Sequence, residues 1–384
     1  METIQIVFRL PPLIDGVGDY AFLLAKELRT SHDVRTVFVV CDPQWIKQEI
    51  ELDDFTVHQL KDRTAEELLR VLAQPGMPTT VLLQYVGYGY AKRGCPVWLT
   101  RGLHAWKGRR RLANGKGMDF QISTSDSSLD RRLVTMFHEI YAFGPPWRSA
   151  FWTSPLQRSI AKRLLDSSDR CRTNTKMHAA MLRKLSPRNA PQIPVLPVFS
   201  NVGEPEYLLP LRQRKRQMLV FGSAAWRRKV YSEQAEALSY ACAALRMEKI
   251  VDVGEPVEIN RNFGLKIEKM GQLPAAEVSR RLSESMFGFL TYFDGFLAKS
   301  GIFAAYCAHG VLPILAGSDG CDLDGIREGR EFSSAWRLQQ NATDVDLQAV
   351  ADNANMWYRN HSLKKTAANT VQLLLEPHTP QFAT

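Results

Sequence analysis

The chain has few cysteines, and none of them has the spacing of a metal site or a disulfide framework. Its 384 residues include six cysteines, no two of which form a C-x-x-C pair, and the nearest two are 14 residues apart. Structural zinc sites and small disulfide-bonded domains both need closer or more regular spacing. We therefore expect a reducing, cytoplasmic environment and no metal.

Long apolar runs and targeting segments are also missing. No stretch of about 18 apolar residues occurs, so we expect no transmembrane helix. The first ten residues, METIQIVFRL, lack the basic start and the small-residue cleavage site of a signal peptide. A hydrophobic fraction of 45% argues against a disordered or collagen-like chain. At roughly 150 residues per domain, the length favours two domains.

Positive charge is concentrated in three clusters that contain no acidic residue. The 49 basic and 40 acidic residues leave a net charge of +9. Such clusters favour phosphate, an anionic membrane surface or nucleic acid as a partner, or else form a solvated face. No known nucleic-acid-binding module is present, so nucleic acid ranks last. The clusters are Lys107, Arg109, Arg110, Arg111 and Lys116; Arg212, Arg214, Lys215 and Arg216; and Arg227, Arg228 and Lys229.

Short apolar runs alternate with amphipathic segments along the chain, and the alternation restarts after the proline-rich residues 187–210. This pattern predicts an α/β protein with two parallel sheets. We expect one domain at residues 1–203, a second at 204–355, and a closing helix in 356–384 that packs back toward the first. The expected strands are 4–10, 34–40, 80–86, 133–137, 217–221, 250–253, 287–292 and 311–315; the expected helices are 17–29, 65–73, 149–165, 176–185, 232–245, 275–284 and 302–309, with two more in 343–375.

Ligands of parallel sheets bind beyond the carboxyl ends of the strands, so the residues after each strand are the candidates. Gly16, Val17 and Gly18 follow the first strand and open a helix, where glycines allow close approach and free N–H groups can hold phosphate. Asp19 lies beside them. The alternative is a plain structural turn, because Ala21 replaces the third glycine of the dinucleotide fingerprint.

His138 and Glu139 follow the expected strand 133–137. An imidazole at this place is well positioned to form a hydrogen bond with a substrate, and it has no metal-ligand spacing with another histidine. The alternative is a histidine whose hydrogen bonds are purely structural.

Two further anion sites are expected in the second half of the chain. Gly222 and Ser223 end a strand and precede Arg228 and Lys229, whose charges would oppose the helix dipole unless an anion bound there. The alternative is simply a basic helix start.

The second of these sites precedes the helix 302–309. Lys299, Ser300 and Gly301 offer an ammonium group, a capping hydroxyl and free N–H groups, and Asp294 opens the same loop. The alternative is an ordinary capped helix.

Six stretches, in order, give the chain its likeness to a known family. They are residues 15–28, 137–139, 220–229, 253–256, 270–274 and 308–314. Together they resemble the GT-B glycosyltransferases, in particular glycosyltransferase family 4. Two features depart from that family: Ser223 stands where it has an arginine, and its E-x7-E glutamates fall on Leu297 and Ala305. Asp294 could replace a missing carboxylate.

The resemblance implies two Rossmann-like domains facing a cleft and an enzyme of carbohydrate biosynthesis. The second domain would hold a nucleotide-sugar donor, and the first a sugar, lipid-linked or small-molecule acceptor. Transfer of a hexosyl or related group would be retaining and would need no metal or other cofactor. Arg228, Lys229 and Lys299 would stabilise the leaving diphosphate. His138 would bind the sugar or position the acceptor, and Gly271, Gln272 and Leu273 would border the nucleobase.

Two other functions remain open on the same fold. One is a nucleotide-sugar epimerase, which needs no acceptor. The other is a non-catalytic protein that binds nucleotides or carbohydrates, which the missing glutamates favour. The segment 98–117 combines tryptophans with the first basic cluster, which predicts a peripheral contact with an anionic membrane at its inner face or, alternatively, a solvated loop.

Overall fold

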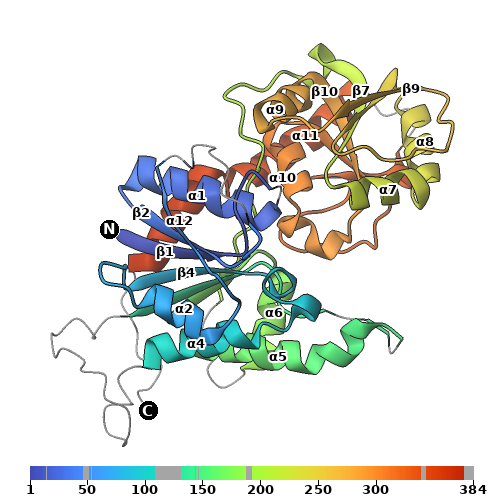
Figure 1. The fold of residues 1–384 in the computed structure, drawn as a ribbon. Helices are drawn as coiled ribbons and strands as arrows, with labels where there is room; N and C mark the ends of the chain where they lie inside the picture. Colours follow the sequence, from blue (N-terminus) through green and yellow to red (C-terminus); the bar gives the residue numbers. More distant parts are fainter. Residues whose placement is uncertain are drawn as a thin grey trace, which may run out of the picture. The chain divides into compact units, whose positions relative to one another are not determined.

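The computed structural model describes residues 1–13, 15–45, 52, 54–108, 131–142, 144–145, 147–186, 193–338 and 343–375. Its two compact units are Met1–Asn174 with His178–Val195 and Thr366–Thr384, and Thr175–Met177 with Leu196–Lys365. Each unit holds one parallel sheet (Figure 1). The domain limits expected from the sequence stay predictions. Of the first basic cluster, Lys107 lies in the described residues, whereas the other four positions lie outside them.

The first unit is built on a parallel sheet whose described strands run in the order β3-β2-β1-β4-β5-β6. Figure 1 shows α1 and α12 on one face of this sheet and α2 and α4 on the other. The central strands β1 and β4 are buried along nearly their whole length, and their two buried glutamines bond to each other, Gln84 Nε2 donating to Gln5 Oε1 at 3.0 Å. The strands are β1 (Glu2–Val7), β2 (Arg35–Val40), β3 (Thr56–Gln59), β4 (Thr80–Tyr85), β5 (Arg132–Phe137) and β6 (Arg170–Thr173); the helices are α1 (Gly16–His32), α2 (Ala65–Leu72), α3 (Gly87–Tyr90), α4 (Val97–Gly108), α5 (Ser149–Ser167), α6 (Lys176–Leu185) and α12 (Leu363–Leu375).

The second unit repeats the plan, with strand order β12-β11-β10-β7-β8-β9 in its described part. Apolar residues of β7 and β10 pack with α8 and α11 in one core. On the other face, the Tyr306 hydroxyl of α10 donates to the carbonyls of Leu219 and Phe289, both at 3.0 Å. The elements are β7 (Lys215–Phe221), β8 (Lys249–Val253), β9 (Lys266–Gly271), β10 (Ser285–Leu290), β11 (Leu312–Leu315), β12 (Ser333–Ser334), α7 (Ala224–Ser232), α8 (Ala235–Ala244), α9 (Ala275–Glu284), α10 (Gly301–Ala308) and α11 (Asp344–Arg359).

The α/β class with two parallel sheets, predicted from the alternation, is confirmed. The pattern missed the strands β3, β6, β9 and β12, which all lie at sheet edges and are short or rich in polar residues. It also missed α4. The helix expected at 232–245 is confirmed as α8, although α8 begins at Ala235 because the preceding helix α7 extends to Ser232. None of the helices in the described ranges is long and apolar enough to cross a membrane.

A buried ion pair fixes α7 to the end of β8. Arg227 is fully buried and donates from Nε and Nη2 to the two carboxylate oxygens of Asp252, at 2.9 and 2.7 Å. Its Nη1 donates to the Glu255 carbonyl at 2.7 Å, and the Tyr231 hydroxyl donates to Asp252 at 2.8 Å. Gly254 has a φ of +144°, and a Cβ there would collide with Nη1 of Arg227. Glycine is therefore required beside this pair.

We expect Arg227→Ala to destabilise the protein by about 3–5 kcal/mol, because it leaves the Asp252 carboxylate buried without its charge partner. Urea denaturation would measure the loss as a lower unfolding midpoint. The neighbouring Arg228→Ala, which removes an exposed cation of the same helix, is the matched control. Equal midpoints for the two variants would contradict the structural role of the pair.

Candidate functional site

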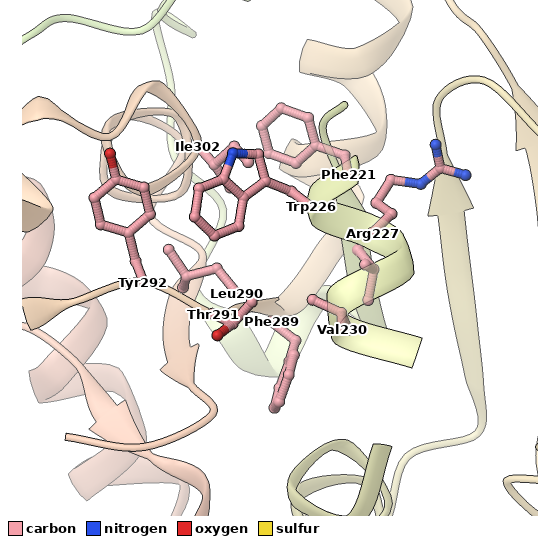
Figure 2. A pocket seen from close by; sticks show the side chains of 10 residues that line it. Phe221, Trp226, Arg227, Val230, Phe289, Leu290, Thr291, Tyr292 and Ile302 are labelled. Carbon is pink, nitrogen blue, oxygen red and sulfur yellow. The ribbon is translucent and has the colours of Figure 1, made fainter. Parts of the chain in front are cut away.

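A hollow in the second unit lies at the carboxyl ends of β7 and β10. Figure 2 shows Trp226 of α7 and Tyr292, which follows β10, beside each other at this hollow, with Ile302 of α10 close by. The rings of Trp226 and Tyr292 have their centroids 5.4 Å apart at an interplanar angle of 35°. The guanidinium of Arg227 points away from both rings toward its partners on β8. The residues that line the hollow are Val220, Phe221, Trp226, Arg227, Val230, Phe289, Leu290, Thr291, Tyr292 and Ile302.

Two helix starts meet beside this hollow. The Ser223 hydroxyl accepts the Trp226 N–H at 3.5 Å and caps α7, while the Ser300 hydroxyl accepts the Phe303 N–H at 3.2 Å and caps α10. Gly222 packs so closely on α10 that a Cβ there would lie 2.6 Å from Cδ1 of Ile302. The partial positive charges of both helix starts therefore point into one region, which is suited to an anion.

Of the three predicted cations, Lys299 stands at a helix start, directly before the α10 cap Ser300, whereas Arg228 and Lys229 lie further along α7, with Lys229 in its last turn. Arg228 is exposed on α7, and Nζ of Lys229 lies 5.6 Å from the ring centroid of Trp226 and 3.9 Å from a Glu233 oxygen. Nζ of Lys299 lies 5.3 Å from the ring centroid of Phe296. None of the three predicted cations is among the described residues that line the hollow, although Lys229 lies over the ring of Trp226, which does line it.

Asp294 is fully engaged in hydrogen bonds with the protein. Its Oδ2 accepts hydrogen bonds from the Ser318 hydroxyl and from the Asp319 and Cys321 N–H groups, each at 3.0 Å. Its Oδ1 accepts the Gly295 N–H at 3.1 Å. The carboxylate thus ties the loop after β11 to the turn after β10. Its proposed substitution for a family glutamate stays a prediction.

The two family glutamate positions carry no charge here. Leu297 and Ala305 are both buried among apolar neighbours of the second unit. The expected nucleobase border, Gly271 to Leu273, lies at the end of β9, where the Gly271 carbonyl accepts the Gly254 N–H at 2.9 Å. It therefore stands at the same sheet edge as Gly254, which packs on Arg227. Its contact with a base stays a prediction.

In the first unit, the start of α1 already carries its own carboxylates. Asp15 caps the helix by accepting the Val17 N–H at 3.3 Å. A Cβ on Gly18 would collide with the Arg9 carbonyl, so this glycine is needed for packing, whereas Gly16 borders open space. Burial and the charge of Asp15 raise the pKa of Asp19 to about 7. Phosphate binding at Gly16–Gly18 stays a prediction, and the local acids oppose it.

His138 is buried at the end of β5 and held at both ring nitrogens. Its Nε2 lies 2.9 Å from Oε1 of Gln84, and its Nδ1 lies 3.4 Å from Nδ2 of Asn174. Gln84 donates in turn to Gln5 at 3.0 Å, which leaves its oxygen as the acceptor for an Nε2–H. The ring of Tyr20 packs edge-on at 5.0 Å. Glu139 follows His138 and is partly exposed.

The sequence pattern missed a buried cation in this cluster. Arg172 of β6 is 2% exposed and donates from Nη2 to the Tyr20 hydroxyl at 3.4 Å. Its Nε and Nη1 have no hydrogen-bond partner in the described protein. In the sequence, only the alternation of charged and uncharged residues in Arg170–Thr173 indicates this strand. Among the described residues, no group of three or more histidine, cysteine or acidic side chains is arranged to hold a metal ion.

The raised pKa of Asp19 predicts a specific pH dependence of stability. Because the folded state keeps the Asp19 proton up to about pH 7, while an unfolded aspartate loses it near pH 4, ionisation of Asp19 costs stability as the pH rises. Asp19→Asn should therefore melt at a higher temperature than the parent protein at pH 8, and the difference should shrink toward pH 4. The exposed Asp62→Asn is the matched control. A difference for Asp19→Asn that does not change with pH would contradict this explanation.

Comparison with known proteins identifies the fold. No family model and no curated protein matches the sequence. A lipopolysaccharide glycosyltransferase, WaaG, matches with a TM-score of 0.56 and 12% identity over 98% of this chain and 100% of its own. An α-glucosyltransferase solved with UDP and DNA matches with a TM-score of 0.58 and 10% identity, over 98% of this chain and 100% of its own. A UDP-N-acetylglucosamine 2-epimerase from Listeria monocytogenes matches with a TM-score of 0.56 and 14% identity, over 96% of this chain and 94% of its own.

These similarities concern the fold alone, because the identities are so low. The similar structures include glycosyltransferases and epimerases. The likeness to family 4 in particular stays a prediction. The chain has the GT-B fold, with two Rossmann-like units.

Proposed function

We propose that the protein is a glycosyltransferase whose second unit binds a nucleotide-sugar donor. The observation that supports this most is the meeting of two serine-capped helix starts, those of α7 and α10, beside an aromatic hollow. A diphosphate matches this arrangement because it is a compact dianion that free N–H groups and cations can share. The acceptor is a sugar, a lipid-linked group or a small molecule, and transfer of the hexosyl or related group is retaining.

The chemistry required is the departure of the nucleoside diphosphate from the sugar. Negative charge grows on the leaving phosphate as the glycosidic bond breaks, and Lys299 before α10, with Arg228 and Lys229 on α7, are the cations assigned to offset it. One preorganised donor of this kind is typically worth ~3 kcal/mol of barrier. No metal is required in this scheme, because helix starts and side chains supply the positive charge. Trp226 and Tyr292 offer apolar surface to the C–H face of the sugar.

The first unit supplies the acceptor side of this proposal. His138 is held at both nitrogens by Gln84 and Asn174, so its ring cannot turn away from a bound ligand without losing hydrogen bonds. A sugar or acceptor hydroxyl would bond to this imidazole by displacing Asn174 from Nδ1, the longer of the two contacts at 3.4 Å. Glu139 and Asp19 remain candidate polar contacts for the acceptor.

Epimerisation of a nucleotide sugar is the second candidate. An epimerase matches this fold as well as the transferases do, and Leu297 and Ala305 replace the family glutamates. Release of free nucleotide that depends on an acceptor would favour the transferase, whereas isomerised donor without any acceptor would favour the epimerase. Donor binding without either reaction would favour a non-catalytic binding protein.

The donor site is tested first by a thermal-shift panel of nucleoside diphosphates and nucleotide sugars. A ligand at about 100 times its dissociation constant stabilises a protein by ~2.7 kcal/mol, which is readily measured. We expect that only nucleotides of one base stabilise the protein. The panel includes UDP because the similar α-glucosyltransferase structure contains it. Absence of any shift across the panel would refute nucleotide binding.

Lys229→Ala should weaken binding of the stabilising nucleotide by about tenfold or more, since a charge-assisted contact is worth about 1.5–3 kcal/mol. Isothermal titration calorimetry gives the affinity directly. Arg212→Ala removes another exposed cation of the same unit and is the matched control. If both variants bind as the parent does, Lys229 lies outside the donor site.

A further inference from the structure

The first unit exposes a ridge of large apolar side chains at the start of α5. Trp147 is 83% exposed and Trp152 is 73% exposed, and Phe151 and Leu156 beside them are also exposed. The rings of Phe151 and Trp152 have their centroids 5.3 Å apart. Scattered exposed apolar residues are normal, but four within ten residues, two of them in ring contact, concentrate apolar surface at one helix start. We call residues 147–156 the α5 ridge.

The inner side of the same helix is firmly anchored, so the ridge is held outward. Gln157 is buried, its Nε2 donates to the Arg93 carbonyl at 2.7 Å, and its Oε1 accepts the Ala142 N–H at 2.7 Å. Ile160 and Leu164 continue the buried stripe. Trp152 and Leu156 are four residues apart and therefore neighbours on the helix surface, and both are exposed.

The charged residues within the segment 147–165 are all basic. From Trp147 to Leu165 the chain contains four basic residues and no acidic residue. Arg148 and Arg163 are exposed, and Arg158 packs over the Tyr141 ring at 4.7 Å. Lys162 pairs with Asp166, at the far end of the helix. An occupant of this surface must therefore match an apolar strip bordered by cations.

An anionic lipid bilayer matches this combination better than a protein partner does. Tryptophan and arginine are favoured where an apolar phase meets a polar one, and amphipathic helices lie in that interface. A stable protein interface needs about 800 Å² on each partner, whereas the ridge is one narrow line of side chains along a helix. We propose that the α5 ridge docks the protein on an anionic membrane surface, with Trp147 and Trp152 inserted at the headgroup level.

This surface differs from the one expected from the sequence, residues 98–117. In the described part of that segment, Trp106 is buried, and the Trp98 Nε1–H donates to the Tyr90 carbonyl at 3.3 Å. Lys107 is likewise engaged, with Asp169 at 2.7 Å. The described part of the segment therefore turns its tryptophans inward, and α5 presents the exposed aromatic residues.

Vesicle sedimentation tests the proposal without any nucleotide or acceptor, so its outcome is independent of the proposed glycosyl transfer. The protein should sediment with vesicles that contain phosphatidylglycerol and far less with pure phosphatidylcholine. The double variant Trp147→Ser/Trp152→Ser should lower binding to the anionic vesicles at least tenfold. Trp336→Ser removes an exposed tryptophan of the second unit and should bind as the parent does. Circular dichroism and melting temperature confirm that each variant is folded.

A second pair of variants tests the role of charge. Arg158→Gln/Arg163→Gln should weaken binding to anionic vesicles and reduce its sensitivity to salt, while Arg359→Gln should not. Failure of the parent protein to bind anionic vesicles would overturn the proposal. So would sedimentation velocity showing a dimer that Trp147→Ser/Trp152→Ser dissociates, because the ridge would then be a contact between copies of this chain.

Discussion

The second unit depends on the buried pair of Arg227 and Asp252. Because this arginine faces inward, the helical rotation of about 100° per residue directs Arg228 and Lys229 to other sides of α7. The same pair fixes the distance of α7 from β8, and so holds the Gly222–Ser223 turn against α10. The pair thereby positions α7, whose Ser223-capped start and Trp226 border the hollow, and leaves Arg228 on its exposed side.

The two units use the carboxyl ends of their strands for opposite electrostatic purposes. In the second unit, neutral serine caps leave the helix starts positive, and Lys299 stands next to the cap of α10. In the first, Asp15 and Asp19 place acids at the start of α1, and neutral amides hold His138. An anion is better accommodated by the second set. This asymmetry is why the proposed donor belongs to one unit and the proposed acceptor to the other.

Local patterns predicted the buried parts of the fold well, since apolar periodicity reports burial. The helix at 176–185 and the helix at 275–284 were predicted with the observed limits. Edge strands escaped notice because one side of each has no strand partner and polar residues are tolerated there. Contacts between residues far apart in the sequence could not be predicted either. The residues around Arg227 in the sequence do not predict its ion pair with Asp252. Those around His138 do not predict its hydrogen bond with Gln84, 54 residues earlier.

Arg172 gives the interior of the first unit a permanent charge. Among the described residues, its only hydrogen-bond partner is the Tyr20 hydroxyl, although burying an ion normally calls for a counter-ion. An apolar side chain of similar length at this position would avoid the free-energy cost of removing a charge from water. Burial raises the pKa of Tyr20, and the guanidinium acts on it in the opposite direction. The buried guanidinium therefore sets up an electric field at this end of β6, and the Tyr20 hydroxyl lies directly in it.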